Sequence, residues 1–199
     1  MFFFYCGMND SAGQRKEYSS DSSLYVARIQ KIKEELKVPD SYGQNPFMPI
    51  QDEAKRLEVF QVDKGGRKHE LTPETVEAWK KMVEAAKQDG VILLSASAFR
   101  SVNRQKEIIK GKLAKGQKIE NILTVNTAPG YSEHHTGRAL DITTPGVEPI
   151  TQEFENTKAF KWLVKNASKF QFELSYPKNN PYNIIYEPWH WRYNPHLKK

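Results

Sequence analysis

The sequence predicts an α+β domain with a small, mainly antiparallel central sheet flanked by helices. Strand-like and helix-like segments are interspersed along the chain without a regular strand–helix–strand repeat, which favours antiparallel pairing. No internal repeat is found, and a length of 199 residues suits one domain with a substantial core. We therefore expect a single domain over residues 23–199, preceded by a flexible segment over residues 1–22.

The first predicted elements are a helix and a loop. Residues 23–37 carry apolar side chains at close to helical spacing among Lys, Arg and Glu, and Pro39 ends this pattern. The segment 40–53 contains glycine and prolines and is predicted to be a loop. We expect Phe47 and Ile50 of this loop to pack against the rest of the domain.

Two strands and two helices are predicted next. Residues 56–62 indicate a strand. A helix is expected to begin at Thr72, because a hydroxyl cap followed by proline and glutamate suits a first turn, and to end at Gly90. The apolar run 91–97 then predicts a central strand, and 103–114 predicts another helix.

The last third of the chain predicts one helix and three strands. Residues 132–141 are expected to run from a loop into a strand, since the segment ends in apolar residues around Asp141. An amphipathic helix is predicted over 157–170. Residues 172–175 and 184–192 have the composition of strands.

Composition narrows the possible functions. An apolar fraction of 38% with 12% aromatic residues is typical of a folded protein. A net charge of +6 favours acidic partners, but the basic residues are scattered without a nucleic-acid-binding module, so nucleic acid is not expected. No stretch reaches the ~20 apolar residues that span a membrane. The single cysteine, Cys6, rules out an internal disulfide and a C-x-x-C metal site. Any metal must therefore be held by His, Asp and Glu.

The N-terminus leaves two interpretations open. The first seven residues are apolar, but they lack a basic start and are too short for a complete signal peptide. They are either the trimmed end of an export or lipoprotein signal, with a lipid on Cys6, or a misassigned start or disordered tail. Tyr5 argues against lipidation, because a lipidated cysteine normally follows a small residue. Residues 8–22 are small and polar, as in a flexible linker.

Three side chains have the chemistry of a zinc site. Neutral imidazole and carboxylate are zinc ligands, and a catalytic site keeps three protein ligands with a fourth position open for water. His134, Asp141 and His190 are candidates for this set. Glu187, three residues before His190, is then a candidate for the base that takes a proton from the water.

An alternative interpretation of His190 is structural. Its position between Trp189 and Trp191 is also typical of a core histidine that bonds a backbone carbonyl. On a regular strand, moreover, Glu187 and His190 would point to opposite faces. Pro188 can break the strand between them, which would let both side chains face one pocket.

Four separate motifs occur in order along the chain. They are Ser97-Ala98-Phe99-Arg100-Ser101 with Gln105, Ser132-Glu133-His134-His135-Thr136-Gly137-Arg138-Ala139-Leu140-Asp141, Ser175-Tyr176-Pro177, and Glu187-Pro188-Trp189-His190-Trp191-Arg192-Tyr193. Together they closely resemble the VanY-type D-alanyl-D-alanine carboxypeptidases, LAS-type zinc peptidases that trim bacterial peptidoglycan stems. The patterns Ser-x-His-x-x-Gly-x-Ala-x-Asp and Glu-x-x-His of that family are both met. The resemblance covers roughly residues 70–194.

The resemblance implies a hedgehog/DD-peptidase-like fold and a set of roles. His134, Asp141 and His190 would bind one Zn²⁺ ion, and Glu187 would be the general base. Arg100 would contact the substrate, where a guanidinium can grip a terminal carboxylate or stabilise the oxyanion of the reaction.

Other residues of the motifs have weaker assignments. Ser97, Gln105 and Ser132 are candidates for hydrogen bonds to the substrate, and Trp189 either walls the pocket or packs in the core. His135 falls on a variable position and is expected near the ligands or at the surface, with ligation as the alternative.

Two further positions bear on the fold. Glu133 is expected to be structural. The chain departs from the family at Gln171, where the family commonly has glycine, so the end of the preceding helix is expected to be slightly strained.

The implied activity is hydrolysis of the terminal D-alanine amide bond of peptidoglycan stem peptides, by a monomer in the bacterial cell envelope. Two alternatives share the fold. One is an endopeptidase that cuts within the stem or a cross-link, and the other is a zinc-stabilised, non-catalytic wall-binding module. The presence of both Glu187 and Arg100 argues against the non-catalytic module.

Overall fold

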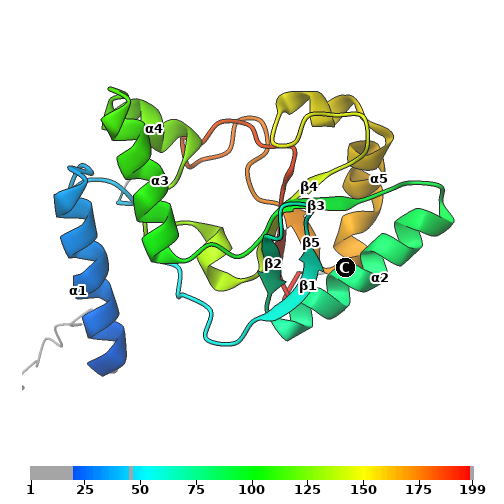
Figure 1. Ribbon diagram of the computed structural model, residues 1–199, viewed down its shortest axis with the longest axis horizontal. Coiled ribbons are helices and arrows are strands. Elements are labelled where there is room, and N and C mark those ends of the chain that lie inside the picture. Colours follow the sequence, from blue (N-terminus) through cyan, green and yellow to red (C-terminus); the bar gives the residue numbers. More distant parts are fainter. Residues whose placement is uncertain (1–19, 45–46, 198–199) are drawn as a thin grey trace, which may run out of the picture.

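The computed structural model describes residues 20–44 and 47–197 (Figure 1). The expectations for an export signal, for lipidation of Cys6 and for most of the flexible segment 1–22 therefore lie outside the described residues. The first helix, α1, spans Ser20–Glu35 and so begins three residues before the predicted start. Within the described residues, none of the helices combines the length and apolar character that a membrane crossing requires.

The fold is α+β, as predicted, with a four-stranded antiparallel sheet in the order β3-β4-β6-β5. The strands of this sheet, in spatial order, are Leu94–Ser97, Ala139–Thr143, His190–Tyr193 and Phe172–Leu174. Strand β6 comes last in sequence and yet lies in the interior of the sheet.

The apolar run at 91–97 does not form the predicted central strand. Strand β3 begins at Leu94 and lies at the edge of the sheet. The preceding Ile92 is 56% exposed, so its side chain does not belong to a buried strand. The edge is covered by a hairpin of β1 (Glu58–Val62) and β2 (Lys68–Leu71). From this hairpin, Arg67 Nη2 donates to Ala96 O at 2.9 Å.

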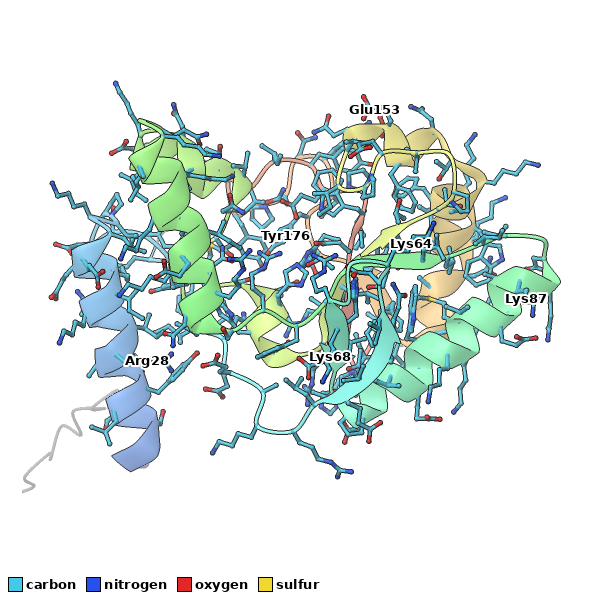
Figure 2. The ribbon with its side chains drawn as sticks, viewed as in Figure 1. Arg28, Lys64, Lys68, Lys87, Glu153 and Tyr176 are labelled. Atoms are coloured by element: carbon cyan, nitrogen blue, oxygen red, sulfur yellow. The ribbon has the colours of Figure 1, made fainter. Side chains whose placement is uncertain are left out.

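The helices fall into two groups on either side of the segment 132–141 (Figure 1). Helices α2 (Pro73–Gln88) and α5 (Lys158–Asn166) share one hydrophobic core with the sheet. Helices α1, α3 (Val102–Ala114) and α4 (Ile119–Val125) surround a second core. The 3₁₀ helices η1, η2 and η3 are Glu133–Thr136, Gln152–Asn156 and Ala167–Phe170. Side chains fill the space between these elements (Figure 2).

The loop before β1 packs differently from the expectation. Phe47 is 74% exposed, whereas its neighbour Met48 is buried in the second core. Ile50 is half-buried and contacts the same cluster, as predicted. The sequence has two large apolar side chains at adjacent positions, and only one of them could point inward.

Gln171 ends η3 in the left-handed backbone conformation, as predicted, with φ of 64°. Such a backbone is strained for a residue with a side chain. The side chain itself compensates: Gln171 Nε2 donates to Pro195 O at 2.9 Å, and Tyr193 Oη donates to Gln171 Oε1 at 3.1 Å. Glutamine thus ties the segment after β6 to the end of η3.

Gly130 packs closely against Ile29 of α1. Its φ is +88°, and a Cβ at this position would lie 2.6 Å from Ile29 Cγ2. Ile29 is buried and β-branched, so it has little freedom to move away. A side chain at position 130 would therefore force Ile29 or the backbone around Gly130 to shift.

We predict that Gly130→Ala lowers the free energy of unfolding by about 2–4 kcal/mol, because left-handed strain and overpacking add. Gly146→Ala is the matched control, since Gly146 has φ of +87° but a Cβ added there would meet no neighbouring atom within 4 Å. The control should lose only about 1 kcal/mol. Urea unfolding of both variants measures the difference, and equal losses would contradict the packing role of Gly130.

Candidate active site

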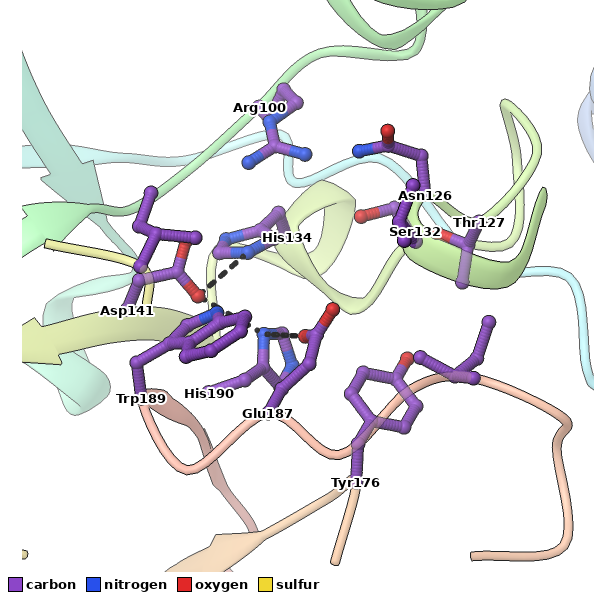
Figure 3. A pocket seen from close by; sticks show the side chains of 13 residues that line it. Arg100, Asn126, Thr127, Ser132, His134, Asp141, Tyr176, Glu187, Trp189 and His190 are labelled. Carbon is purple, nitrogen blue, oxygen red and sulfur yellow. Dashed lines mark hydrogen bonds and ion pairs between the residues drawn. The ribbon is translucent and has the colours of Figure 1, made fainter. Parts of the chain in front are cut away.

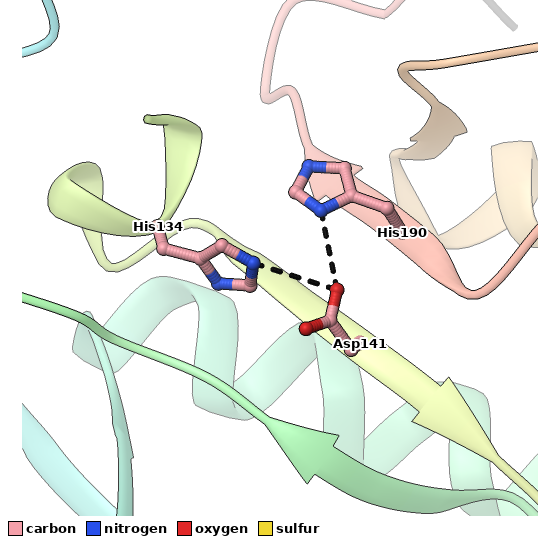
Figure 4. A group of neighbouring side chains, drawn as sticks. All are labelled: His134, Asp141 and His190. Atoms are coloured by element: carbon pink, nitrogen blue, oxygen red, sulfur yellow. Dashed lines mark hydrogen bonds and ion pairs between the residues drawn. The ribbon is translucent and has the colours of Figure 1, made fainter. Parts of the chain in front are cut away.

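Strand pairing brings the three predicted ligands together. In the β4–β6 register, Asp141 lies directly opposite His190. His134 reaches them from η1, because Gly137 ends that turn with φ of 63° and leads the chain into β4. One ligand atom from each of the three residues lies within 4.8 Å of the others, and all three side chains are buried (Figure 4). The three side chains are therefore close enough together to hold one metal ion.

Hydrogen bonds determine which histidine nitrogen faces the centre. His134 Nδ1 lies 2.8 Å from Ala98 O, a bond that requires a donor, and this leaves Nε2 at 3.4 Å from Asp141 Oδ1. His190 Nε2 donates to Glu133 Oε2 at 3.0 Å, and His190 Nδ1 lies 3.2 Å from Asp141 Oδ1. Ligand histidines commonly donate their other ring nitrogen to a carbonyl or carboxylate in this way.

The charges at the centre suit a cation. Burial raises the pKa of Asp141, but the His134 and His190 charges and hydrogen bonds lower it more, so it stays ionised. Burial lowers the pKa of His190, but hydrogen bonds to Asp141 and Glu133 raise it to about 10. The centre therefore attracts a proton when no metal is present. Two imidazoles and a carboxylate form the donor set of a catalytic zinc site, so these residues fit that ion.

Glu133 holds His190 and Arg192 in position, which agrees with the structural role expected for it. Besides accepting from His190, it accepts from Arg192 Nη1 at 2.9 Å through Oε1. Burial raises its pKa, but the His190 hydrogen bond and the charges of His190 and Arg192 lower it to about 2. The carboxylate is thus held ionised behind the ligand histidine.

The strand predicted at 184–192 begins only at His190. Before it, residues 188–189 form a turn that is closed by a hydrogen bond from His190 N to Glu187 O at 3.1 Å. This break at Pro188 lets both side chains face one cavity, as predicted, with Glu187 Oε2 3.8 Å from His190 Nδ1 (Figure 3).

Glu187 has the acidity of a residue that exchanges protons near neutral pH. Burial raises its pKa to about 7, the largest of several influences; the charge of His190 opposes this and that of Asp141 adds to it. A general base is most effective when its pKa lies near the working pH.

The cavity extends from the three ligands to Arg100, with a volume of about 140 Å³. Ser132 and Trp189, both predicted to contact substrate, line it (Figure 3). The full lining is Arg100, Val125, Asn126, Thr127, Ser132, His134, Asp141, Ile150, Tyr176, Ile184, Glu187, Trp189 and His190.

The structure places two predicted substrate contacts behind Arg100 and outside the cavity lining. Gln105 has no exposed surface, because its Nε2 donates to Thr127 O at 2.7 Å and its Oε1 accepts from Arg100 Nη1 at 2.9 Å. Ser97 Oγ accepts from Arg100 Nη2 at 3.4 Å. Both side chains therefore orient Arg100.

His135 is neither a ligand nor a surface residue. It is fully buried, its Nδ1 donates to Arg100 O at 2.6 Å, and its Nε2 accepts from Gly130 N at 3.1 Å. Both ring nitrogens are thus occupied, and the neutral ring holds the backbone of Arg100 against the motif loop.

Six lining residues received no role from the sequence, and Tyr176 and Asn126 are two of them. Tyr176 was part of a recognised motif, and its buried ring lies 4.8 Å from the His190 ring, centroid to centroid. Asn126 belongs to no motif, and reaches the cavity because α4 ends beside it. Only the tertiary arrangement could identify Asn126.

Two imidazoles and a carboxylate around one point, with a second buried carboxylate beside a cavity, define the site of a metal-dependent hydrolase. A family model described as VanY, D-alanyl-D-alanine carboxypeptidase, matches residues 68–196. The chain belongs to this family.

Individual relatives agree with this assignment. The putative carboxypeptidase YodJ of Bacillus subtilis is 37% identical over 139 residues, which cover 67% of this chain and 50% of YodJ. The chain thus spans half the length of that relative. The solved LdcB LD-carboxypeptidase is 33% identical with a TM-score of 0.65, covering 74% of this chain and 72% of LdcB. A vancomycin resistance D,D-pentapeptidase VanY, solved as a mutant with Zn(II), is 28% identical with a TM-score of 0.55, covering 73% and 82%.

We predict that His135 makes the fold sensitive to acid. Burial lowers its pKa to about 4, despite the opposing hydrogen bond to Arg100 O, whereas an unfolded histidine titrates near 6.5. Between these values the unfolded chain binds a proton that the folded protein does not. Stability therefore falls as the pH falls through this window, by up to about 3 kcal/mol.

His135→Gln keeps a donor and an acceptor but cannot titrate, so its stability should depend less on pH between 6.5 and 4. Denaturant unfolding at several pH values measures this slope. His196→Gln, at an exposed histidine, should retain the wild-type slope. Equal slopes for His135→Gln and wild type would show that His135 does not cause the acid sensitivity.

Proposed function

We propose that this protein is a zinc-dependent carboxypeptidase that hydrolyses the terminal D-alanine amide bond of peptidoglycan stem peptides. The observation that carries the proposal is the placement of Glu187, a buried carboxylate beside the His134, Asp141 and His190 centre, in a cavity whose opposite wall holds Arg100. Membership of the VanY family supports the same substrate.

Each residue has a defined task in this reaction. A bound zinc ion supplies Lewis acidity towards the attacking water and the scissile carbonyl. Glu187 takes the proton from that water on a carboxylate oxygen and then passes it to the departing amine nitrogen. Arg100 binds the negative charge of the substrate with the planar donor group of its guanidinium. Ser132 and Trp189 contact the peptide from the cavity wall.

The proposal includes the domain and its location. Residues 23–199 form one peptidase domain with a catalytic core at about 70–194, which the family match over 68–196 supports. Because stem peptides lie outside the cytoplasm, the protein acts in the bacterial cell envelope, as a monomer. Because one of the solved relatives is an LD-carboxypeptidase, the configuration of the residue before the terminal D-alanine has to be determined by experiment.

Synthetic stem pentapeptide and tetrapeptide, incubated with zinc-loaded protein, test the function by mass spectrometry. We expect loss of one terminal alanine, abolished by a chelator and restored by added zinc. The preferred peptide distinguishes DD from LD specificity. Internal cleavage would instead indicate the endopeptidase, and two intact peptides would contradict the carboxypeptidase proposal.

Two substitutions separate the metal ligands from the base. Glu187→Gln should keep stoichiometric zinc and lose about 10²–10⁴-fold in kcat, because the amide cannot accept the proton. His190→Ala should lose both zinc and activity, since a ligand is removed. Metal analysis after dialysis and steady-state kinetics give the two readouts. Undiminished turnover of Glu187→Gln would remove Glu187 from the mechanism.

A further inference from the structure

One face of α3 holds a wall of the cavity in place. Gln105 and Lys112 lie seven residues apart on this helix, so they project from the same side. Gln105 Nε2 donates to Thr127 O at 2.7 Å, and Lys112 Nζ donates to Asn126 Oδ1. The segment that follows α4 is therefore fixed to α3 through the neighbouring residues Asn126 and Thr127, both of which line the cavity.

Lys112 determines how the Asn126 amide is turned. An ammonium group has donors and no acceptor, so it pairs with the amide oxygen. The amide nitrogen, with two N–H donors, is left on the other side of the group. In Figure 3 this nitrogen points towards the guanidinium of Arg100. Across residues 20–44 and 47–197, no protein acceptor bonds to Asn126 Nδ2, so its donors are available to a bound molecule.

The two ends of the cavity carry opposite charge. Asp141 and Glu187 lie at the metal end, and Arg100 lies at the other. Burial, followed by the charge of Arg100, lowers the pKa of Lys112, so the two cations influence each other. In the described part of the chain Lys112 forms no ion pair, and its hydrogen bond is to a neutral amide. The positive charge at the Arg100 end of the cavity therefore favours binding of an anionic group.

We propose that Asn126 is a specificity-determining residue whose Nδ2 donates to the C-terminal carboxylate of the substrate, beside Arg100, and that Lys112 holds it in this orientation. The inference rests on the proposed carboxypeptidase function and deepens it. An internal peptide bond presents no carboxylate at this position. Recognition by Asn126 and Arg100 would thus restrict cleavage to the free end of a stem peptide.

The test compares a cleavable stem peptide with its C-terminal carboxamide. In Asn126→Asp one oxygen keeps the Lys112 contact, and the other replaces the donor in the cavity with a negative acceptor. We expect KM for the carboxylate peptide to rise about tenfold to a hundredfold, because a bond to a charged group is lost and repulsion is added. KM for the carboxamide should fall or stay level, since its N–H can donate to the aspartate, and kcat should change by less than about threefold.

Further variants separate recognition from structure. Asn126→Leu removes the donor without adding charge, so it should raise KM for the carboxylate peptide without improving the carboxamide. Lys112→Met frees the amide to turn and should give a smaller increase in the same direction. Asn121→Asp, an equal charge change at an exposed position of α4, is the matched control and should keep wild-type kinetics.

The outcomes distinguish this inference from the function on which it rests. If wild-type protein cleaves the stem peptide and Asn126→Asp retains its KM and its preference for the carboxylate, the role of Asn126 is overturned and the carboxypeptidase stands. If zinc-loaded wild-type protein cleaves neither peptide, the proposed function fails, and the inference fails with it. A reversed preference confined to the Asn126→Asp variant supports the proposal.

Discussion

The site depends on the register in which β4 pairs with β6. This pairing sets Asp141 opposite His190, while the preceding pair, Leu140 and Trp191, points into the core on the other face. Because side chains alternate along a strand, a slip of one residue would bury the ligands in the core and expose the apolar pair. The cost of burying Asp141 in an apolar core makes that alternative unfavourable. The hydrophobic core thus enforces the geometry of the metal centre.

Glu133 and Arg100, two charged groups beside the centre, are each held by neighbouring residues. Glu133 links His190 to Arg192, and His135 anchors the backbone of Arg100. Gln105, on α3, then accepts a hydrogen bond from the Arg100 guanidinium. Buried polar groups are stable only when such partners are present. The result is a set of side chains with little freedom, so a substrate and a cation meet groups that are already oriented.

The sequence predicted the parts of the site that depend on local spacing. His134 and Asp141 belong to one short motif, and Glu187, Pro188 and His190 belong to another, whereas the family resemblance joined the two motifs across 49 residues. Prediction failed where burial was decided between distant segments. The hydrogen bond from Gln105 to Thr127 O joins two separate elements and could not be read from the sequence. The apolar run 91–97 was expected to be central, because nothing in its composition indicates that β3 lies at the edge of the sheet. The four-residue strand β2 and the seven-residue helix α4 were not predicted, since such short elements carry little periodicity.

The position of β6 has a consequence for biosynthesis. Of the four strands of this sheet, β6 is made after the other three, yet it must insert between β4 and β5. Until then β4 and β5 have no shared neighbour, and the chain holds His134 and Asp141 without their third partner. Contacts between such distant segments form slowly, because a long loop has to close. The nascent protein therefore remains without a complete centre until the segment around residue 190 has been made and has folded.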